Sequence, residues 1–305
     1  MSTISVTTTK LTPADSEVIE SFAPAFDGTR LYVRRRAGPS KTTAILCDGI
    51  CCDGFIYKYL WDDLARVLSV AHWNYRGHGR SATPGDPEAL GVDAHTRDLD
   101  AVRLELGDPP AVLIGHSFGT EIALEAYRLR PKGVRALVLL CGSYGRVTHT
   151  FKNSEVLANV LPRLSEFASR HPKIARAIWS RVPPRTALRI ALLTGEIDPR
   201  TVRPEDVEPY FHHVAHIDFP MFAKMLALAG EHSAEDLLPD IDVPVLVIAG
   251  DHDSFTPPEL SKRMCEIIPK AELVMLPGGT HVAPLEQHEL VALRIEKFLT
   301  EHALL

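Results

Sequence analysis

One short turn between a predicted strand and a predicted helix constrains this chain more than any other feature. Ala111–Ile114 (AVLI) is an apolar run typical of a buried strand, and Glu121–Leu129 is an amphipathic run rich in alanine and leucine. Between them lies Gly115–Gly119, with the sequence GHSFG. A strand and a helix can come this close only where the residues two before and two after the central serine are small. The turn therefore lifts the Ser117 hydroxyl above the edge of a sheet, next to a helix N-terminus that favours negative charge.

Strands and helices alternate along most of the chain. The Asp27-Gly28 pair predicts a turn between two short strands within Phe22–Arg36. Further apolar runs predict strands at Thr42–Cys47, Ser69–Tyr75, Val134–Cys141, Pro244–Ala249 and Leu273–Leu276. Helical patterns occupy Tyr57–Val67, Val92–Leu106 and Leu285–His302. This spacing is typical of βαβ units and predicts a mostly parallel sheet, whereas residues 1–20 are expected to be loosely ordered.

The alternation stops between Gly142 and about Asp240, where no clear strand pattern occurs. Helical patterns fill this block instead, at Glu155–Arg170, Pro172–Arg181, Pro184–Leu193, Arg203–His213 and Pro220–Ala229. The strand pattern resumes at Val243. The helical block therefore separates two strands of the same sheet.

Polar residues follow two of the later strands. Asp251 and Asp253 come after Pro244–Ala249, and His281 comes after Leu273–Leu276. Because open α/β sheets carry their chemistry at the carboxyl ends of the strands, we expect His281 and one of these aspartates to meet Ser117. A serine hydroxyl needs a base to take its proton, and imidazole titrates nearest to neutral pH. A carboxylate would then fix the imidazole tautomer and stabilise the imidazolium.

Together these motifs resemble those of a known family. The GHSFG turn, the order Ser, Asp, His, and the turn Arg76–Ser81 (RGHGRS) resemble the α/β-hydrolase superfamily, and within it the cap-bearing serine hydrolases of the esterase and lipase type. The resemblance covers roughly residues 25–300 and implies an α/β fold: a mostly parallel eight-stranded α/β-hydrolase sheet with helices on both faces. It also implies a core of residues 21–142 and 241–305, with residues 143–240 as a helical cap inserted after the sixth strand.

The resemblance further implies which carboxylate belongs to the catalytic set. Similar proteins carry the acid three residues after the glycine that ends this strand, which matches Gly250 and Asp253. Asp251, the competing assignment, is expected to form the turn. Some members place the acid after the sixth strand, but Cys141–Tyr144 contains no carboxylate. The predicted catalytic residues are therefore Ser117, Asp253 and His281, and no cofactor or metal is expected.

Two backbone N–H groups are expected to bind the oxyanion of an acyl-transfer reaction. Phe118 follows the serine and supplies one, and Ile50, in the loop after the third strand, is expected to supply the other. Similar sequences usually carry His-Gly in this loop, whereas this chain carries Asp48-Gly49. A carboxylate about 4 Å from the oxyanion would cost roughly 4 kcal/mol at an effective dielectric of about 20. We therefore expect Asp48 to point away and accept backbone hydrogen bonds; the alternative is a protonated or water-positioning carboxyl in the pocket.

A serine nucleophile forms an acyl-enzyme, so the substrate should carry an activated carbonyl. An apolar stripe in the helical block is interpreted either as packing or as a hydrophobic acyl or aryl pocket. Its predicted substrate-binding residues are Phe211, Phe219, Met221, Phe222 and Met225. Hydrolysis of carboxylic esters with a hydrophobic acyl or aryl group is the favoured function. The alternatives are a carbon–carbon bond hydrolase of the meta-cleavage type, an acyltransferase or perhydrolase with the same triad, and a slow-turnover small-molecule receptor.

Composition argues against several other classes. A net charge of −6 leaves no electrostatic footprint for nucleic acid. No apolar stretch approaches the length of a membrane span or forms a signal core, so a cytoplasmic location is expected. The five irregularly spaced cysteines argue against a disulfide framework, and Cys51 and Cys52 are expected to pack in their loop or line the acyl pocket. The group His212, His213 and His216 lacks an acidic residue that would complete a zinc site. The oligomeric state stays open.

Overall fold

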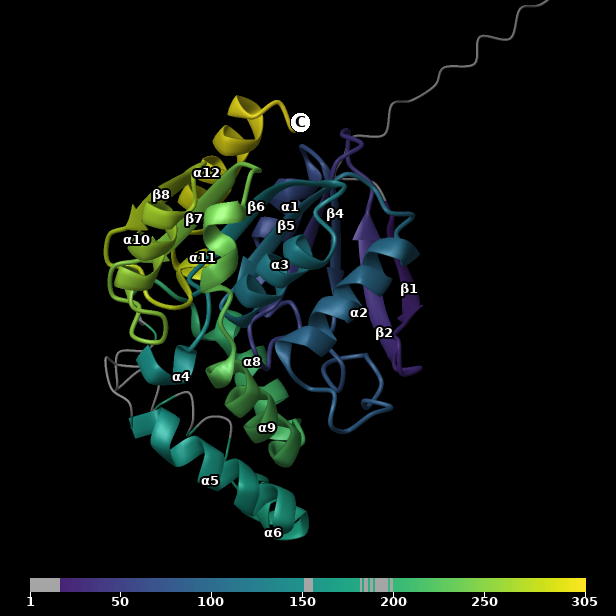
Figure 1. Ribbon diagram of the computed structural model, residues 1–305, viewed down its shortest axis with the longest axis vertical. Helices are drawn as coiled ribbons and strands as arrows, with labels where there is room; N and C mark the ends of the chain where they lie inside the picture. Colours follow the sequence, from purple (N-terminus) through teal and green to yellow (C-terminus); the bar gives the residue numbers. More distant parts are fainter. Residues whose placement is uncertain are drawn as a thin grey trace, which may run out of the picture.

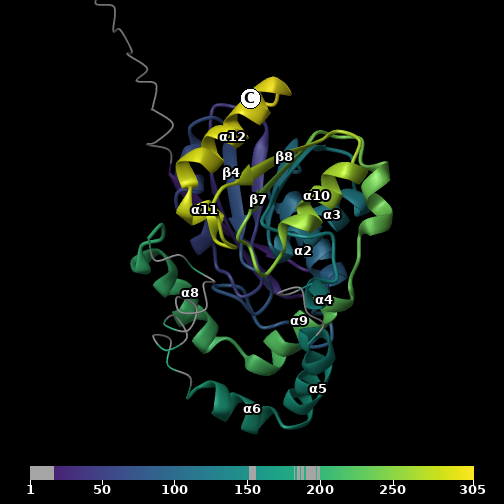
Figure 2. The same ribbon diagram turned by 90° about the vertical axis from the view of Figure 1, so that its left-hand side faces the viewer.

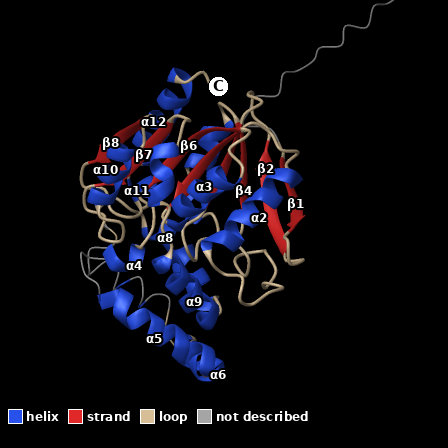
Figure 3. Ribbon diagram, in the orientation of Figure 1, coloured by secondary structure: helices blue, strands red, loops and turns tan. Residues whose placement is uncertain are grey.

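An eight-stranded sheet forms the centre of the protein (Figures 1 and 3). The computed structural model describes residues 17–150, 156–181, 183, 186, 189, 197 and 200–305. The strand order is β1-β2-β4-β3-β5-β6-β7-β8, in which β2 pairs antiparallel with β1 and β4 and all other pairs are parallel. The strands are β1 (Val18–Pro24), β2 (Arg30–Arg36), β3 (Thr43–Cys47), β4 (Ser69–Trp73), β5 (Ala111–His116), β6 (Val134–Leu140), β7 (Val245–Gly250) and β8 (Ala271–Leu276). The expected mostly parallel eight-stranded sheet is confirmed.

Helices cover both faces of this sheet. Side chains alternate between the two faces along each strand, so the apolar central strands present apolar side chains to both faces. Ile45 and Leu113 pack into one core with the helices α2, α3 and α10. Their chain neighbours Leu46 and Ile114 pack into a second core with α1 and α12. These helices span Leu60–Ala65 (α1), Val92–Glu105 (α2), Phe118–Leu129 (α3), Pro258–Ile267 (α10) and His288–Glu301 (α12). Two apolar layers thus hold the central strands rigidly and fix the loops at their ends.

A block of helices separates β6 from β7. Figures 1 and 2 show that these helices gather at one end of the molecule, opposite the C-terminus. They are α4 (Val147–Thr150), α5 (Val156–Arg170), α6 (Pro172–Trp179), α8 (Pro204–His216) and α9 (Phe219–Glu231); the 3-10 helix η4 (Glu235–Asp240) follows them and lies next to α10. The helix expected at Pro184–Leu193 lies largely outside the described residues. No helix in the described part of the chain is both long and apolar enough to cross a membrane.

Helix α8 is tied to the loop after β3 and to the 3-10 helix η2 (Phe55–Tyr57) within it. The buried Asp206 carboxylate pairs with Lys58 and accepts a hydrogen bond of 2.8 Å from the Tyr59 hydroxyl. The rings of Phe55 and Tyr210 stack with their centroids 4.9 Å apart. These contacts bring one helix of the block directly over the carboxyl end of the sheet.

Three boundaries differ from the sequence expectations. Residues 18–20 are not loosely ordered, because Val18–Pro24 pairs along its whole length with β2; residues 1–16 lie outside the described part. The expected helix over Tyr57–Val67 is shorter, with α1 spanning only Leu60–Ala65. The last predicted helix is divided at Gln287 into α11 (Ala283–Glu286) and α12, because Gln287 leaves the helical conformation at φ −129° and ψ 41°.

Candidate active site

The turn between β5 and α3 holds Ser117 in a strained backbone conformation, with φ 54° and ψ −118°. The two glycines around it have no room for a side chain. A Cβ on Gly115 would lie 2.2 Å from the carbonyl oxygen of Gly119, and a Cβ on Gly119 would lie 2.1 Å from the carbonyl oxygen of Cys47. Because both obstacles are backbone atoms, only glycine allows strand, turn and helix to pack at this distance.

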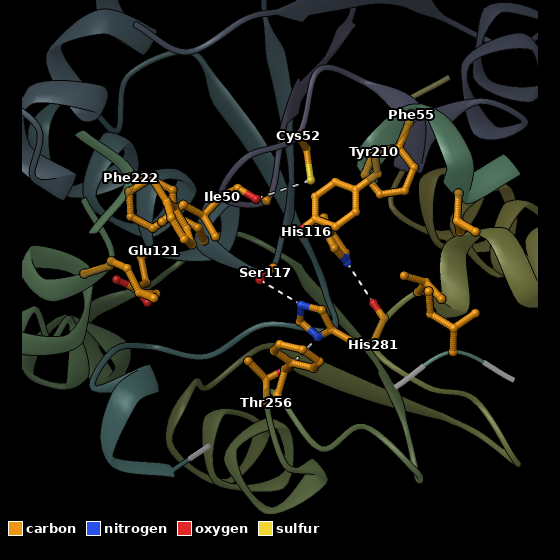
Figure 4. Close-up of a pocket in the computed structure, with 18 of the residues that line it drawn as sticks. Ile50, Cys52, Phe55, His116, Ser117, Glu121, Tyr210, Phe222, Thr256 and His281 are labelled. Carbon is orange, nitrogen blue, oxygen red and sulfur yellow. Dashed lines mark hydrogen bonds between the residues drawn. The ribbon is translucent and has the colours of Figure 1, made fainter. Parts of the chain in front are cut away.

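Three side chains from separate loops meet at this turn, and Figure 4 shows two of them, Ser117 and His281. His281, in the loop after β8, lies with its Nε2 atom 2.9 Å from the Ser117 Oγ atom. Its Nδ1 atom lies 2.9 Å from Oδ2 and 3.1 Å from Oδ1 of Asp253, in the loop after β7. The imidazole thus bridges hydroxyl and carboxylate in the arrangement that lets a base accept the serine proton.

Asp253 is fixed as a buried carboxylate by its own loop. The backbone N–H groups of Phe255 and Thr256 each donate to Oδ1 at 2.9 Å, and the Thr256 hydroxyl lies 2.8 Å from Oδ2. Burial raises the pKa of Asp253, but the charge and hydrogen bond of His281 and the bonds from Thr256 outweigh it and hold this pKa below its ordinary value. Asp251, in contrast, accepts the backbone N–H of Gly278 at 2.6 Å and stays away from His281.

The loop after β3 passes directly beside Ser117. A Cβ on Gly49 would lie 3.3 Å from the Ser117 Cβ, and Ile50 lines the same cavity as Ser117 and Phe118. The Phe118 N–H is the first of α3 and therefore has no acceptor within the helix. Two tyrosines that the sequence analysis did not single out support the loop from beneath: the hydroxyls of Tyr57 and Tyr75 donate to the carbonyl oxygens of Cys47 and Asp48, each at 2.6 Å.

Asp48 points away from the cavity and into the protein, fully buried. Its Oδ2 atom lies 2.7 Å from Nε2 of His72 on β4. The expectation that Asp48 accepts backbone hydrogen bonds was wrong, since its partner is a side chain on the neighbouring strand. The reason is register: Leu46 of β3 pairs with His72 of β4, which brings His72 next to the loop that follows β3.

His116 and the loop cysteines lie beside the site in neutral form. His116 Nε2 donates to the carbonyl oxygen of His281 at 2.9 Å, and burial lowers the pKa of His116 to about 3. Cys51 and Cys52 are free and buried, and burial raises the pKa of both thiols well above the ordinary value. Cys52 lines the cavity. None of these groups is poised as a nucleophile.

A cavity of about 420 Å³ opens over Ser117 and is lined mainly by apolar side chains. None of the described residues that line it is a lysine or an arginine. The elements that contribute most of its wall are the loop after β3, α3, α8 and α9. The lining residues include Ile50, Cys52, Phe55, Phe118, Glu121, Val207, Tyr210, Phe211, Phe222, Leu226, Ala229, Phe255 and Val282.

The five predicted substrate-binding residues separate into two groups. Phe211 and Phe222 line the cavity. Phe219, Met221 and Met225 are not among its lining residues: Phe219 stacks on Trp179 with ring centroids 4.6 Å apart, Met221 packs beside Gly77, and Met225 is fully buried in the core. Helical spacing explains the positions of Met221 and Met225, whereas Phe219 lies one turn before Phe222 and packs on Trp179 instead. Positions 222, 226 and 229 share the face of α9 turned to the cavity, whereas 221 and 225 lie on the next face.

The histidines of α8 are dispersed. His213 Nδ1 lies 3.9 Å from an Asp53 oxygen, and His216 Nδ1 lies 2.6 Å from the carbonyl oxygen of His212. Across the described residues, no three His, Cys, Asp or Glu side chains gather in a way that could hold a metal ion.

A serine on a strained strand-to-helix turn, at the carboxyl edge of a mostly parallel eight-stranded sheet, defines the α/β-hydrolase class. The model of the alpha/beta hydrolase family matches residues 49–294, and the chain belongs to this family.

The similarity to known proteins extends over almost the whole chain. The chain is 28% identical to polyketide synthase ThaQ of Burkholderia thailandensis over 281 residues, which are 90% of this chain but only 12% of that protein. It is 25% identical to the putative carbamate hydrolase RutD of Rhizobium rhizogenes over 266 residues, which cover 86% of this chain and 94% of the relative. An esterase from Exiguobacterium antarcticum has the same fold, with a TM-score of 0.70, 18% identity, and coverage of 92% of this chain and all of that one.

Proposed function

We propose that this protein is a serine hydrolase that cleaves carboxylic esters with a hydrophobic acyl or aryl group. One observation carries most of the support: the His281 ring nitrogens lie 2.9 Å from Ser117 Oγ and 2.9 Å from Asp253 Oδ2. When a hydroxyl, a base and an orienting acid are hydrogen-bonded in this order, the hydroxyl can form an acyl-enzyme without a cofactor.

The first half-reaction attaches the acyl group to the enzyme. Ser117 Oγ attacks the ester carbonyl while His281 Nε2 accepts its proton, and Asp253 stabilises the resulting imidazolium. The backbone N–H groups of Phe118 and Ile50 bind the oxyanion of the tetrahedral intermediate. The intermediate then collapses, and His281 donates the proton to the departing alcohol oxygen.

The second half-reaction releases the acid. His281 takes a proton from water, which attacks the acyl carbonyl, and the proton then returns to Ser117 Oγ as the acid leaves. If another alcohol or hydrogen peroxide competed with water, the same steps would give acyl transfer or perhydrolysis. The outcome therefore depends on which acceptor reaches the acyl-enzyme.

Several features support a neutral, largely apolar substrate. The cavity offers about 420 Å³ with a mainly apolar wall, and its described lining includes no lysine or arginine that could pair with an anionic substrate. In this proposal the helices from α4 to α9 act as a cap over the substrate. The five free cysteines fit work in a reducing compartment such as the cytoplasm.

A chain-length series of p-nitrophenyl esters tests the function. We expect wild type to hydrolyse these esters, and Ser117→Ala to lower kcat by at least about 10⁴-fold because the attacking atom is lost. Ser261→Ala, which removes a buried hydroxyl on α10, is the matched control and should retain activity. Full activity in Ser117→Ala would refute the assigned nucleophile. Turnover of a ring-cleaved diketone in place of the esters would favour the carbon–carbon bond hydrolase.

A further inference from the structure

One buried carboxyl group of the cavity takes no part in the mechanism above. Glu121 lies on α3, four residues after Ser117, and it lines the same cavity. Its side chain is fully buried. Figure 4 shows Glu121 and Phe222 on one side of Ser117, and Phe55 and Tyr210 on the other. Since an α-helix rises about 1.5 Å per residue, Glu121 lies about 6 Å along the helix from the nucleophile.

Both carboxyl oxygens of Glu121 lack a hydrogen-bond partner among the described residues. Neighbouring basic side chains are engaged elsewhere. Arg128 donates to Glu125 at 2.9 Å and to Asp236 at 2.8 Å, and His232 lies 3.3 Å from Glu125. Glu125 thus has partners one turn further along the same helix, while Glu121 lines the cavity and has none among the described residues.

A buried carboxyl without a partner is unfavourable unless it is neutral. Burial raises the pKa of Glu121 well above its ordinary value, and the nearby charge of Glu125 raises it further. A neutral carboxylic acid presents one O–H donor and one carbonyl acceptor. The wall around it is apolar, with Phe118, Phe222 and Leu226. This side of the cavity therefore combines a buried hydrogen-bonding group with apolar side chains.

We propose that Glu121 is a specificity-determining residue, whose carboxyl group hydrogen-bonds a neutral polar group of the substrate, such as a ketone or hydroxyl, within about one helical turn of the ester carbonyl. The inference deepens the proposed ester hydrolysis and rests on it. A purely hydrocarbon chain in this position leaves the carboxyl without a partner, whereas a ketone or hydroxyl satisfies it. The loss of one such bond corresponds to about a tenfold difference in kcat/KM.

Matched esters test this role. The acyl series consists of p-nitrophenyl heptanoate and its 4-, 5- and 6-oxo derivatives; the alcohol series consists of heptyl acetate and the corresponding oxoheptyl acetates. We expect wild type to prefer one oxo isomer over its hydrocarbon parent by about tenfold. Glu121→Gln, which retains a donor and an acceptor, should keep the preference, whereas Glu121→Leu should abolish it. Ser261→Ala is the control and should leave the ratio unchanged.

Three results would overturn the role of Glu121. The first is that wild type prefers no oxo ester over its hydrocarbon parent in either series. The second is that Glu121→Leu keeps the preference of wild type. The third is that wild type prefers p-nitrophenyl 6-(trimethylammonio)hexanoate and that Glu121→Gln abolishes this preference. The last result would mean an ionised carboxylate that binds cations. A thermal melt of each variant checks folding, and Glu121→Leu should melt no lower than wild type because it removes a buried polar group without a partner.

A binding measurement separates this inference from the proposed function. If wild type cleaves none of the esters, ester hydrolysis is refuted. Calorimetric binding of the heptyl and oxoheptyl acetates to Ser117→Ala, with and without Glu121→Leu, then decides the role of Glu121 without turnover. One oxo ester should bind Ser117→Ala about tenfold more tightly than its parent, and the double variant should bind both equally. Equal binding of all esters to Ser117→Ala would refute the inference.

Discussion

Asp48 and Glu121 are two fully buried carboxyl groups near the Ser117 turn, and their surroundings are opposite. Asp48 contacts His72 at 2.7 Å and faces the protein interior. Glu121 lines the cavity and has no hydrogen-bond partner among the described residues. The same residue class therefore holds the loop after β3 in one case and lines the cavity without a described partner in the other.

The contact between Asp48 and His72 makes a prediction about stability. Asp48→Ala leaves the buried His72 Nε2 atom without its partner and should lower the free energy of unfolding by about 1–3 kcal/mol. Asp48→Asn keeps a hydrogen-bond acceptor for His72 and should lower the free energy of unfolding by less. Urea denaturation measures both, and Asp53→Asn, on the same loop but partly exposed, is the control. Neither Asp48 variant should move the midpoints of the pH–rate profile; a shifted profile at unchanged stability would favour a carboxyl that acts in the pocket.

At the scale of elements, the strand, turn and helix around Ser117 form a unit whose packing depends on two glycines. Gly119 lies in α3, where alanine would ordinarily be the better helix former by about 1 kcal/mol. A Cβ there would nevertheless lie 2.1 Å from the carbonyl oxygen of Cys47, so α3 or β3 would have to move. The position of Ser117 therefore depends on contact between elements rather than on helix propensity.

Gly119→Ala should accordingly destabilise the protein by about 3 kcal/mol or more, because backbone atoms cannot yield as a flexible side chain would. Gly107→Ala is a suitable comparison: Gly107 has φ 82° and open space around it, so only backbone strain of about 1–2 kcal/mol applies. Chemical denaturation of the two variants gives the comparison. A Gly119→Ala protein as stable as wild type would show that the contact between α3 and β3 is looser than described.

At the scale of the whole molecule, three buried histidines contribute to the pH dependence of stability. Burial lowers the pKa of His78 to about 4 and that of His95 and His116 to about 3. Near pH 7 each of these histidines is neutral in the folded protein. It is also neutral in the unfolded chain as long as the pH is above the ordinary histidine pKa. Below that pKa the unfolded chain binds protons that the folded protein excludes. Stability is therefore lost as the pH falls from about 6.5 towards 4.

Over that range, each of these histidines should lower the free energy of unfolding by about 1.4 kcal/mol for each unit by which the pH falls. Urea unfolding at pH 7.5, 6.5, 5.5 and 4.5 should show a nearly constant free energy down to pH 6.5 and a steep decline below it. His78→Gln should reduce the slope by about 1.4 kcal/mol per unit, whereas His302→Gln, on the surface, should leave it unchanged. A flat profile between pH 6.5 and 4.5 would contradict the burial of these rings as neutral groups.

The sequence determined the features that depend on local chemistry. Apolar runs and helical periods predicted the strands, and the GHSFG turn predicted the tight strand-to-helix junction. The order of Ser117, Asp253 and His281 after three strands predicted that they meet, because parallel strands end at one edge. Helical periodicity also contained a signal for Glu121, four residues after Ser117, although the chain alone could not reveal its burial.

Only the tertiary structure decided which side chains face one another across separate elements. The pairing of Asp48 with His72 depends on the register of two strands, and the support from Tyr57 and Tyr75 depends on how their segments pack beneath the loop. The face of α9 that lines the cavity depends on how this helix sits over the sheet, so Phe222 lines it while Met225 enters the core. Contacts between residues far apart in sequence arise from packing, which local patterns do not encode.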